Sequence, residues 1–442
     1  MNIDKQQIDD LNLKLTLTFA PEDYEAQEKK KLSEYKRNAE LKGFRKGMAP
    51  LSLIKHIYGD RALGDALDSM INEELGKFIK ENNLRLIGEP LPSEDQPKIE
   101  LKDGETFTFM YDLAKYPEVN VAVGSDDNLT SYKIKVTDEA KKEMKENMLR
   151  QLSKMGETEV AQAGDYLVVD LENEEKKVTG AYVTVDEVAG EAKEKVIGAK
   201  AGDKFDINVN DAFPEASNRA AVLKTTQPEL EKISDPLFHV TVVNVRRMFP
   251  GEENQESYDT LFGKDKVHNS EEFDKAVEAQ LEANYKQESD FQLNKDIREY
   301  LVKKADIKLP EDFLKRWLLY ANEGKFTKDD IEKEFDGFLK DFRWQLVRDS
   351  LMQKYGLKIE DADLQGAAEG YVRYQYAMYG MSEVPEDMMK VAVQQLLADE
   401  NQARNMRESV ANAKVFDAVK KDIKTSEKTV SVEDFRKLSE NK

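Results

Sequence analysis

One short stretch of the sequence combines residue types that suit docking on another molecule. Residues 29–46 carry eight lysines and arginines against two glutamates, inside a chain that is otherwise acidic. The stretch runs into Gly43-Phe44-Arg45-Lys46-Gly47-Met48-Ala49-Pro50, where two glycines and a proline predict a loop. An aromatic ring beside two cations at a loop tip would supply an apolar anchor and two groups for acidic or phosphate partners.

The same segment permits a plainer interpretation. Phe44 could fold back into the core of its own domain and leave Arg45 and Lys46 simply solvated, because large apolar side chains are often buried. The exposure of the Phe44 ring separates the two interpretations.

Other chemistry is not indicated by the residue types. The chain has no cysteine, and its histidines, His56, His239 and His268, are not spaced to share a helical face, so we expect no thiol chemistry and no metal centre. No phosphate loop of the G-x-x-x-x-G-K-S/T kind occurs in the sequence. The sequence therefore predicts no catalytic residue, no metal ligand and no cofactor.

Length and charge restrict the class of protein. The chain of 442 residues is long enough for about three domains. Its 67 basic and 88 acidic residues give a net charge of −21, and such a surface repels nucleic acid except where cations gather, so we expect no DNA partner. The N-terminus lacks the pattern of a signal peptide and no apolar run reaches membrane-spanning length, which predicts a cytoplasmic protein with no membrane partner.

The elements that must position the loop are predicted to form an α+β domain over residues 1–115. Apolar residues alternate over 11–19 and again over 107–113, which indicates two half-buried strands. A charged helix is predicted over 21–43, because Pro21 suits a first helical turn and Gly43 a helix end. A second helix carries apolar residues at spacings of three and four over 62–79.

Three further parts follow the first domain, and the predicted fold class is a multidomain α+β protein. Residues 116–159 are predicted to be a connector that contains one strand and one helix. Residues 160–247 hold short β-prone runs punctuated by glycines, which indicates a small β-rich domain. Residues 248–442 are predicted to form a large helical domain.

The last part of the chain yields two more specific expectations. Pro385 is predicted to open a helix that runs toward Phe416. The tail after Lys424 is polar, so it is expected to be loosely held.

The loop and its surroundings resemble the trigger factor family, bacterial chaperones that wait at the nascent-chain exit of the ribosome. Gly43-Phe44-Arg45-Lys46-Gly47 followed by Pro50 resembles the family's ribosome-docking signature. Ile57-Tyr58-Gly59 follows at the expected place, and Tyr116-Pro117-Glu118-Val119 is similar to the exit from the family's first domain. The resemblance implies that Phe44, Arg45 and Lys46 contact ribosomal protein and RNA. Met48 and Ala49 stand where many members have a lysine and another apolar residue, so somewhat weaker docking is expected.

By the same resemblance we expect an ATP-independent, ribosome-associated chaperone that shields newly made polypeptides during folding. Its partners would be the ribosome and unfolded or nascent chains, and a homodimer of the free protein is left open. Two rival functions are a working peptidyl-prolyl isomerase and a holding or assembly chaperone that never meets the ribosome.

The β-rich domain resembles the FKBP-type prolyl isomerases only in part. Residues 196–205 and Phe213-Pro214-Glu215 are similar to that fold, whose chemistry needs an aromatic pocket that desolvates the prolyl amide. Ala192 stands where the aromatic floor of the pocket is expected, which implies little or no isomerase activity. Alternatively, aromatic residues from elsewhere converge on the pocket, the candidates being Tyr166, Tyr182, Phe213 and Phe238.

One stretch of the helical domain is rich in tyrosine and methionine. Both side chains suit weak contacts with varied apolar clients, because methionine adapts its shape and tyrosine joins apolar area to a polar edge. The same residues at helical spacing are also typical of an ordinary core. The candidate client-binding residues are Tyr371, Tyr374, Tyr376, Met378, Tyr379, Met381, Met388 and Met389.

Overall fold

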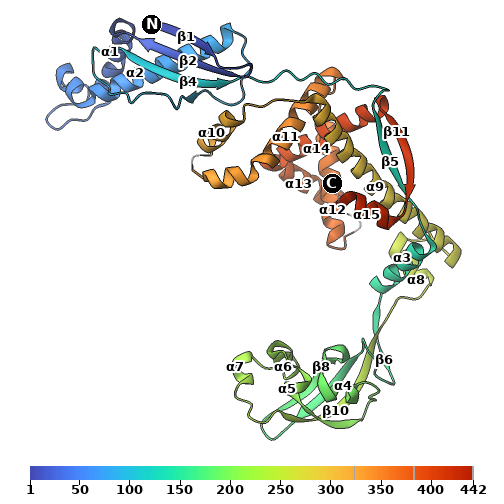
Figure 1. Ribbon diagram of the computed structural model, residues 1–442. Coiled ribbons are helices and arrows are strands. Elements are labelled where there is room, and N and C mark those ends of the chain that lie inside the picture. Colours follow the sequence, from blue (N-terminus) through green and yellow to red (C-terminus); the bar gives the residue numbers. More distant parts are fainter. Residues whose placement is uncertain (323, 382–383, 441–442) are drawn as a thin grey trace. The chain divides into compact units, whose positions relative to one another are not determined.

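The computed structural model describes residues 1–322, 324–381 and 384–440 of the chain (Figure 1). The chain divides into two compact units that interleave along the sequence. One unit comprises residues 1–130 and 293–426, and the other comprises residues 131–292 and 427–442. Sheets and helices both contribute, so the predicted α+β multidomain class is confirmed.

The head of the first unit is an antiparallel sheet covered by two helices. Leu13, Leu15 and Leu17 alternate toward the interior from one strand, as the sequence predicted, and they share a buried core with Leu63 and Leu67 of the longer helix. The strands are β1 (Asn2–Gln7), β2 (Asn12–Phe19), β3 (Leu91–Pro92) and β4 (Phe107–Ala114), in the order β1-β2-β4-β3, and the helices are α1 (Pro21–Asn38) and α2 (Leu51–Glu81).

The predicted end of the first helix at Gly43 is wrong. Helix α1 ends at Asn38, because Ala39 already has extended backbone angles of φ −66° and ψ 130°. The apolar residues Leu32, Tyr35 and Ala39 still follow helical spacing, but Ala39 packs from the extended chain. The loop between α1 and α2 is therefore longer than the glycines alone indicated.

The helical body of the first unit is built on three long helices. Its core joins Ile297 and Leu301 of α9 to Trp344 and Val347 of α11 and to Val419 of α14. The helices are α9 (Ser270–Ala305), whose first part belongs to the second unit, α10 (Glu311–Ala321), α11 (Lys328–Lys354), α12 (Asp361–Met378), α13 (Glu386–Ala398) and α14 (Glu400–Asp422).

The helix predicted to run from Pro385 toward Phe416 is interrupted. Helix α13 ends at Ala398, and the Asp399 side chain accepts hydrogen bonds from the backbone N–H groups of Asn401 and Gln402 at 3.0 and 2.9 Å. This is an N-terminal cap, so α14 begins as a separate helix.

Within the first unit the head is attached to the body through apolar and ionic contacts. Leu91 and Ala114 of the head share a buried cluster with Phe313 and Leu314 of α10. The Arg316 guanidinium lies 2.7 Å from the Asp112 carboxylate. These contacts place α10 beside the head sheet.

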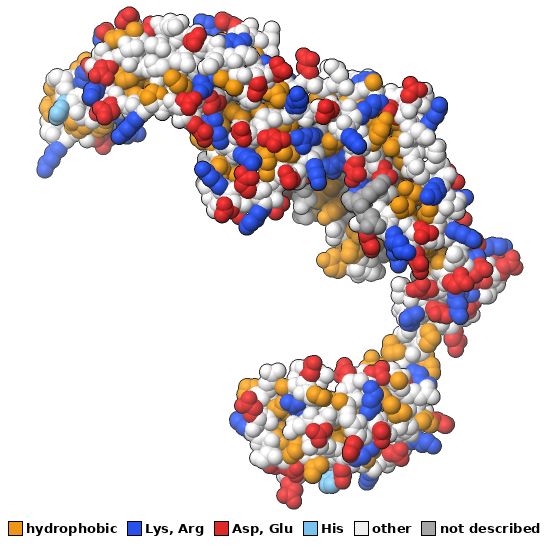
Figure 2. All heavy atoms as spheres, in the orientation of Figure 1, with side chains coloured by type: hydrophobic (Ala, Val, Ile, Leu, Met, Phe, Trp, Pro, Cys, Tyr) orange, Lys and Arg blue, Asp and Glu red, His pale blue; other side chains and the backbone are white. Residues whose placement is uncertain are grey.

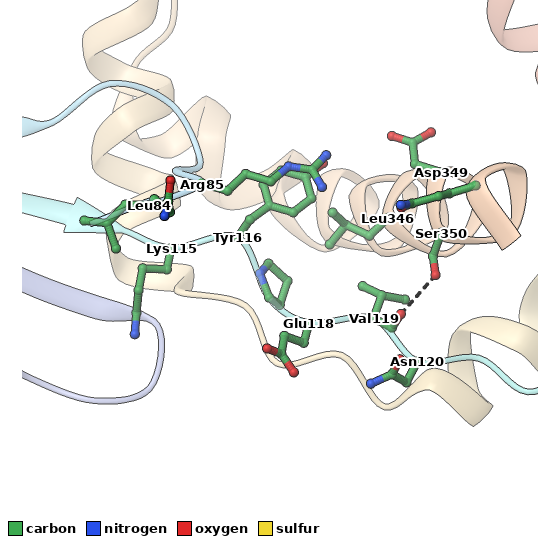
Figure 3. Close-up of a pocket in the computed structure, with 13 residues that line it drawn as sticks. Leu84, Arg85, Lys115, Tyr116, Glu118, Val119, Asn120, Leu346, Asp349 and Ser350 are labelled. Carbon is green, nitrogen blue, oxygen red and sulfur yellow. Dashed lines mark hydrogen bonds between the residues drawn. The ribbon is translucent and has the colours of Figure 1, made fainter. Parts of the chain in front are cut away.

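The connector that leaves the head crosses a polar groove of about 500 Å³ (Figure 3). The Arg85 guanidinium lies over the Tyr116 ring at 4.2 Å from its centroid. The Ser350 hydroxyl of α11 donates to the Val119 carbonyl oxygen at 2.9 Å, and the Lys354 ammonium donates to the carbonyl of Val121. The connector is thus held along α11.

The second unit contains the β-rich domain and a small helical lobe. The sheet has the order β6-β10-β7-β8, with β9 paired to β10. The strands are β6 (Lys154–Thr158), β7 (Tyr166–Glu172), β8 (Lys177–Thr184), β9 (Lys204–Asn208) and β10 (Leu237–Phe249); short helices α4 (Gly190–Val196), α5 (Val209–Ala212), α6 (Ala216–Val222) and α7 (Gln227–Leu230) and the 3₁₀ turn η1 (Val185–Glu187) pack around them. The lobe is made of α3 (Asp138–Gln151), α8 (Gln255–Phe262) and the start of α9.

The expectation of a loosely held tail is also wrong. Residues after Lys424 form strand β11 (Lys424–Val430), which pairs with β5 (Asn128–Ile134), and helix α15 (Val432–Glu440). Phe435 of α15 is buried against Ile134 and meets the Tyr132 ring edge-on. Most of β11 is exposed on both faces, so neither face needs apolar residues. The sequence of β11 therefore lacks the apolar alternation that would predict a strand. Among the described residues, no helix is both long and apolar enough to cross a membrane.

Candidate functional site

The loop that joins α1 to α2 has a defined shape. Gly43 and Gly47 have φ angles of +92° and +80°, in the left-handed region that glycine adopts without steric cost. Between them the backbone turns twice, with hydrogen bonds from the Phe44 N–H to the Leu41 carbonyl at 3.1 Å and from the Met48 N–H to the Arg45 carbonyl at 2.9 Å. The two glycines therefore frame a tight tip that carries Phe44, Arg45 and Lys46.

A buried residue on one side and a partly buried residue on the other anchor this tip. Ala49 lies in a small core with Leu32 of α1 and Ile54 of α2, and Leu41 packs against the same core from the other side. Pro50 stands directly before α2 and accepts the first backbone hydrogen bonds of that helix. Because the flanks are anchored, the residues between them are forced toward solvent.

Phe44 is exposed, as the docking interpretation requires. Its side chain shows 43% of its surface to solvent. Arg45 is exposed as well, and the Lys46 ammonium lies 3.3 Å from the Glu40 carboxylate with both side chains largely in water. Exposed ion pairs of this kind contribute little, so Lys46 stays available to a partner.

Sequence reasoning missed three apolar neighbours of the tip. Met48, Leu51 and Ile57 are also exposed, and Met48 shows 70% of its surface. Helical spacing in the sequence could have indicated this exposure. Leu51 and Ile57 lie outside the buried stripe of α2, which includes Ile54 and Ala62.

A network of charged and aromatic groups supports the stem of the loop. Lys55 lies 2.5 Å from the Asp103 carboxylate and 3.6 Å from Glu28, which is buried. Burial raises the pKa of the Glu28 carboxyl, while the hydrogen bond to Asp103 raises the pKa of Lys55. The Tyr35 and Tyr58 rings stack with centroids 5.3 Å apart, which joins α1 to α2 behind the tip.

The tyrosine- and methionine-rich stretch lies on α12, α13 and the turn between them. Most of its members face solvent, and Tyr379 is the most exposed, at 84%. Figure 2 shows hydrophobic side chains gathered beside this turn. The exposed members are Tyr371, Tyr374, Met378, Tyr379, Met381 and Met388, and Tyr376 is partly buried.

Met389 does not belong to that exposed surface. It is only 6% exposed and packs with Ala368, Val372 and Val393 in the core between α12 and α13. Met388 and Met389 are neighbours in sequence, so helical geometry turns one outward and the other inward. The placement of Met389 among client-binding residues is therefore corrected.

Two exposed aromatics at α10 and at the approach to α11 were not predicted. Tyr320 lies on α10 and Phe326 just before α11, and both are exposed. No pattern in the sequence marked them, because a single aromatic near a helix end is usually buried.

In the β-rich domain, the position of an isomerase pocket holds only a small cavity. Its volume is about 10 Å³, which is room for a water at most. Ala192 lines it, together with Phe205, Phe213 and aliphatic side chains. Of the four aromatics named as alternatives, Phe213 lines the cavity, Phe238 is buried in the core and Tyr182 is exposed, while Tyr166 is partly buried and lies outside the lining.

Comparisons with known proteins agree along nearly the whole chain. The model of the bacterial trigger factor protein matches residues 1–148, that of the probable trigger factor FKBP-like domain matches 155–250, and that of the probable trigger factor C-terminal domain matches 289–439. The chain belongs to the trigger factor family.

Individual relatives of the chain are distant. The trigger factor of Geobacter sp. (strain M21) is 26% identical over 336 residues, which cover 72% of each chain. That of Syntrophotalea carbinolica is 22% identical over 424 residues, or 93% of this chain and 87% of the relative. A solved structure described as "Promiscuous Substrate Recognition in Folding and Assembly Activities of the Trigger Factor Chaperone" is similar with a TM-score of 0.54 and 18% identity, covering 95% of this chain and 99% of that one.

Family membership confirms the predicted class of function. As a member of the trigger factor family, the chain is a molecular chaperone of the ribosome-associated type. The solved structure shows the shared fold and, at this identity, no more than the fold.

Proposed function

We propose that this chain docks beside the nascent-chain exit of the ribosome through Phe44, Arg45 and Lys46 and shields emerging polypeptides in the bacterial cytoplasm without ATP. The observation that carries the proposal is the exposed ring of Phe44 beside Arg45 and Lys46, on a loop that Ala49 and Leu41 anchor to a small core. Gly43, Gly47 and Pro50 shape the loop, which resembles the ribosome-docking signature of the trigger factor family and lies within the matched residues 1–148.

Phe44 and the two cations are proposed to make different kinds of contact with the ribosome. Phe44 can enter an apolar recess of a ribosomal protein and lose most of its remaining contact with water. Arg45 and Lys46 can meet acidic side chains or RNA phosphates around that recess, where charge-assisted hydrogen bonds are strong. The rest of the chain carries a net negative charge, so Arg45 and Lys46 also orient the approach of the loop to a negatively charged partner.

Co-sedimentation with purified ribosomes tests this docking. The triple variant Phe44→Ala, Arg45→Ala, Lys46→Ala should remain in the supernatant, whereas wild type should pellet with ribosomes and do so less as salt rises. A control that removes two exposed cations of α1, Lys29→Ala with Lys30→Ala, should pellet like wild type. Equal pelleting of wild type and the triple variant would leave the chain as a chaperone that acts away from the ribosome.

We further propose that clients are held by side chains of α12, α13 and the turn between them, together called the α12–α13 turn. Seven candidates remain once the buried Met389 is left out: Tyr371, Tyr374, Tyr376, Met378, Tyr379, Met381 and Met388. Several weak contacts retain an unfolded segment by their number and still let it leave. Suppression of aggregation of a chemically unfolded protein measures this holding function. The variant Tyr374→Ser, Met378→Gln, Tyr379→Ser should suppress aggregation less than wild type.

The β-rich domain is proposed to be a scaffold with little or no prolyl isomerase activity. The cavity of about 10 Å³ at Ala192 is too small for a prolyl ring unless Phe205 or Phe213 moves. A proline-limited refolding assay tests this, since uncatalysed isomerisation takes tens of seconds or more. Acceleration that disappears when residues of this domain are changed would make the chain a working isomerase instead.

The exposed tip also offers a way for two free copies to associate. Phe44 and Met48 would then be covered in a homodimer when no ribosome is present. Sedimentation velocity across a concentration series would show a dimer that Phe44→Ala weakens.

A further inference from the structure

A two-stranded ribbon in the second unit leaves three large apolar side chains in water. The neck ribbon consists of Lys154–Thr158 of β6 and Val245–Phe249 of β10, paired antiparallel. Met155 lies directly opposite Met248 in this pairing, so the two side chains share one face. They are 44% and 42% exposed, and Phe249 is 42% exposed.

Phe249 occupies the other face of the same ribbon. Its ring lies over Gly156. A Cβ added at this glycine would come within 3.0 Å of the ring, so a residue with a side chain would crowd Phe249 at this position. Figure 2 shows the hydrophobic side chains gathered on the narrow segment between the β-rich domain and the α3–α8 lobe. Both faces of the ribbon thus present apolar area.

Other contacts, not these three side chains, hold the ribbon in place. In the middle of the ribbon Arg247 makes two hydrogen bonds of 2.7 Å to the buried Asp165 carboxylate, and at one end Val245 lies in the core of the β-rich domain. At the other end the Gly251 N–H donates to the Leu149 carbonyl of α3 at 2.8 Å. None of these contacts involves Met155 or Met248. The ribbon is therefore held in place without the two exposed methionine side chains.

The charges around the ribbon indicate what could cover it. Residues 154–160 and 246–256 carry three basic and five acidic side chains. Arg247 is paired with Asp165, and two of the five acidic groups are paired as well, Glu256 with Lys154 at 2.9 Å and Glu253 with Lys145 at 3.0 Å. Adding the two outside partners, Asp165 and Lys145, gives six acidic and four basic groups. The apolar area is therefore bordered by net negative charge, which complements an apolar segment flanked by lysine or arginine.

We propose that the neck ribbon is a second contact surface for unfolded polypeptide, and that it favours apolar segments with basic flanks. Methionine suits such a surface, because its unbranched, polarisable side chain fits varied partners. The proposal rests on the chaperone function of the chain and adds a contact site remote in sequence from the α12–α13 turn. It also gives the β-rich domain a use that does not depend on isomerase chemistry.

Fluorescence anisotropy with the full-length chain tests the proposal. The probe is a labelled synthetic peptide of fifteen residues, with a central run of leucine, valine and phenylalanine and two lysines at each end. The double variant Met155→Gln, Met248→Gln should bind it at least threefold more weakly than wild type. The matched control Leu237→Gln, an exposed apolar residue at the far end of the same strand β10, should bind like wild type.

A second peptide with glutamates in place of the lysines sharpens the test. Wild type should bind it more weakly than the lysine-flanked peptide, and the double substitution should change its binding less. Equal binding of the lysine-flanked peptide by wild type and the double variant would overturn the proposal. If wild type bound neither peptide, the client-holding function would fail and this inference with it.

Photo-crosslinking identifies the occupant. A benzoylphenylalanine introduced at position 248 of the full-length chain should crosslink to the lysine-flanked peptide. Crosslinks only between two copies of the chain would show that the ribbon is a self-association surface, and would overturn the proposal. Unchanged circular dichroism spectra of both glutamine variants exclude unfolding as the cause of any loss.

Discussion

The loop between α1 and α2 and the turn between α12 and α13 both present aromatic side chains to solvent, but in different settings. Phe44 is a single aromatic beside two cations, on a tip that Ala49 and Leu41 anchor to a small core. The α12–α13 turn spreads exposed tyrosines and methionines over two helices. The first arrangement suits one shaped site with a strong anchor, and the second suits many sites with weak contacts.

The largest expected effect lies in the core beneath the α12–α13 turn. Met389→Ala removes a buried side chain and should lower the free energy of unfolding by about 2–5 kcal/mol. The exposed neighbour Met388 offers a matched control, because Met388→Ala should change the free energy of unfolding by about 0.5 kcal/mol or less. Denaturant titration followed by circular dichroism measures both; similar losses for the two variants would contradict the division of this stretch into core and surface.

The next effect concerns the anchor of the docking tip. Phe44→Ala alone should weaken ribosome binding about tenfold or more, because a single central aromatic carries much of the affinity of such interfaces. Binding of labelled protein to ribosomes at fixed salt measures this loss. A loss of less than about twofold would show that the tip has no dominant anchor and resembles the α12–α13 turn instead.

A smaller effect is expected from the cations beside the anchor. Arg45→Ala with Lys46→Ala should weaken ribosome binding several-fold at low salt and should flatten its dependence on salt, because fewer counterions are then released. Phe44→Ala should leave that dependence nearly unchanged. Parallel salt curves for wild type and the double variant would mean that neither cation meets a phosphate or carboxylate.

The smallest effect is expected from single changes at the α12–α13 turn, where clients are proposed to bind. Tyr379→Ser should weaken binding of an unfolded peptide by about twofold or less, since its contact is one of many. Substitutions at Tyr374 and Met378 should add to it in the combined variant. A tenfold loss from Tyr379→Ser alone, measured by anisotropy, would indicate a specific pocket in place of a distributed surface.

Local features of the chain were predictable wherever the sequence carries its own signal. The alternation of Leu13, Leu15 and Leu17 marked β2, because a strand with one buried face must repeat every two residues. Gly43 and Gly47 marked the loop between α1 and α2, because both adopt left-handed backbone angles that favour glycine. The order of the N-terminal, FKBP-like and C-terminal parts was likewise predictable from the sequence.

Features that depend on distant partners were not predictable in the same way. Strand β11 is mostly polar and exists because β5, far away in the sequence, supplies its hydrogen-bonding partner. The break between α13 and α14 depends on whether Asp399 caps a new helix or remains inside a longer one, a choice that helical periodicity does not make.

The sequence by itself determined which residue types stand at the docking tip, in the tyrosine-rich stretch and beside Ala192. Only the tertiary structure decided their exposure: it leaves Phe44 in water, buries Met389 and closes the cavity at Ala192 to about 10 Å³. Exposure depends on what packs against each side chain, and those neighbours come from other elements of the fold. Composition and spacing therefore indicate what a residue can do, while packing decides whether a partner can reach it.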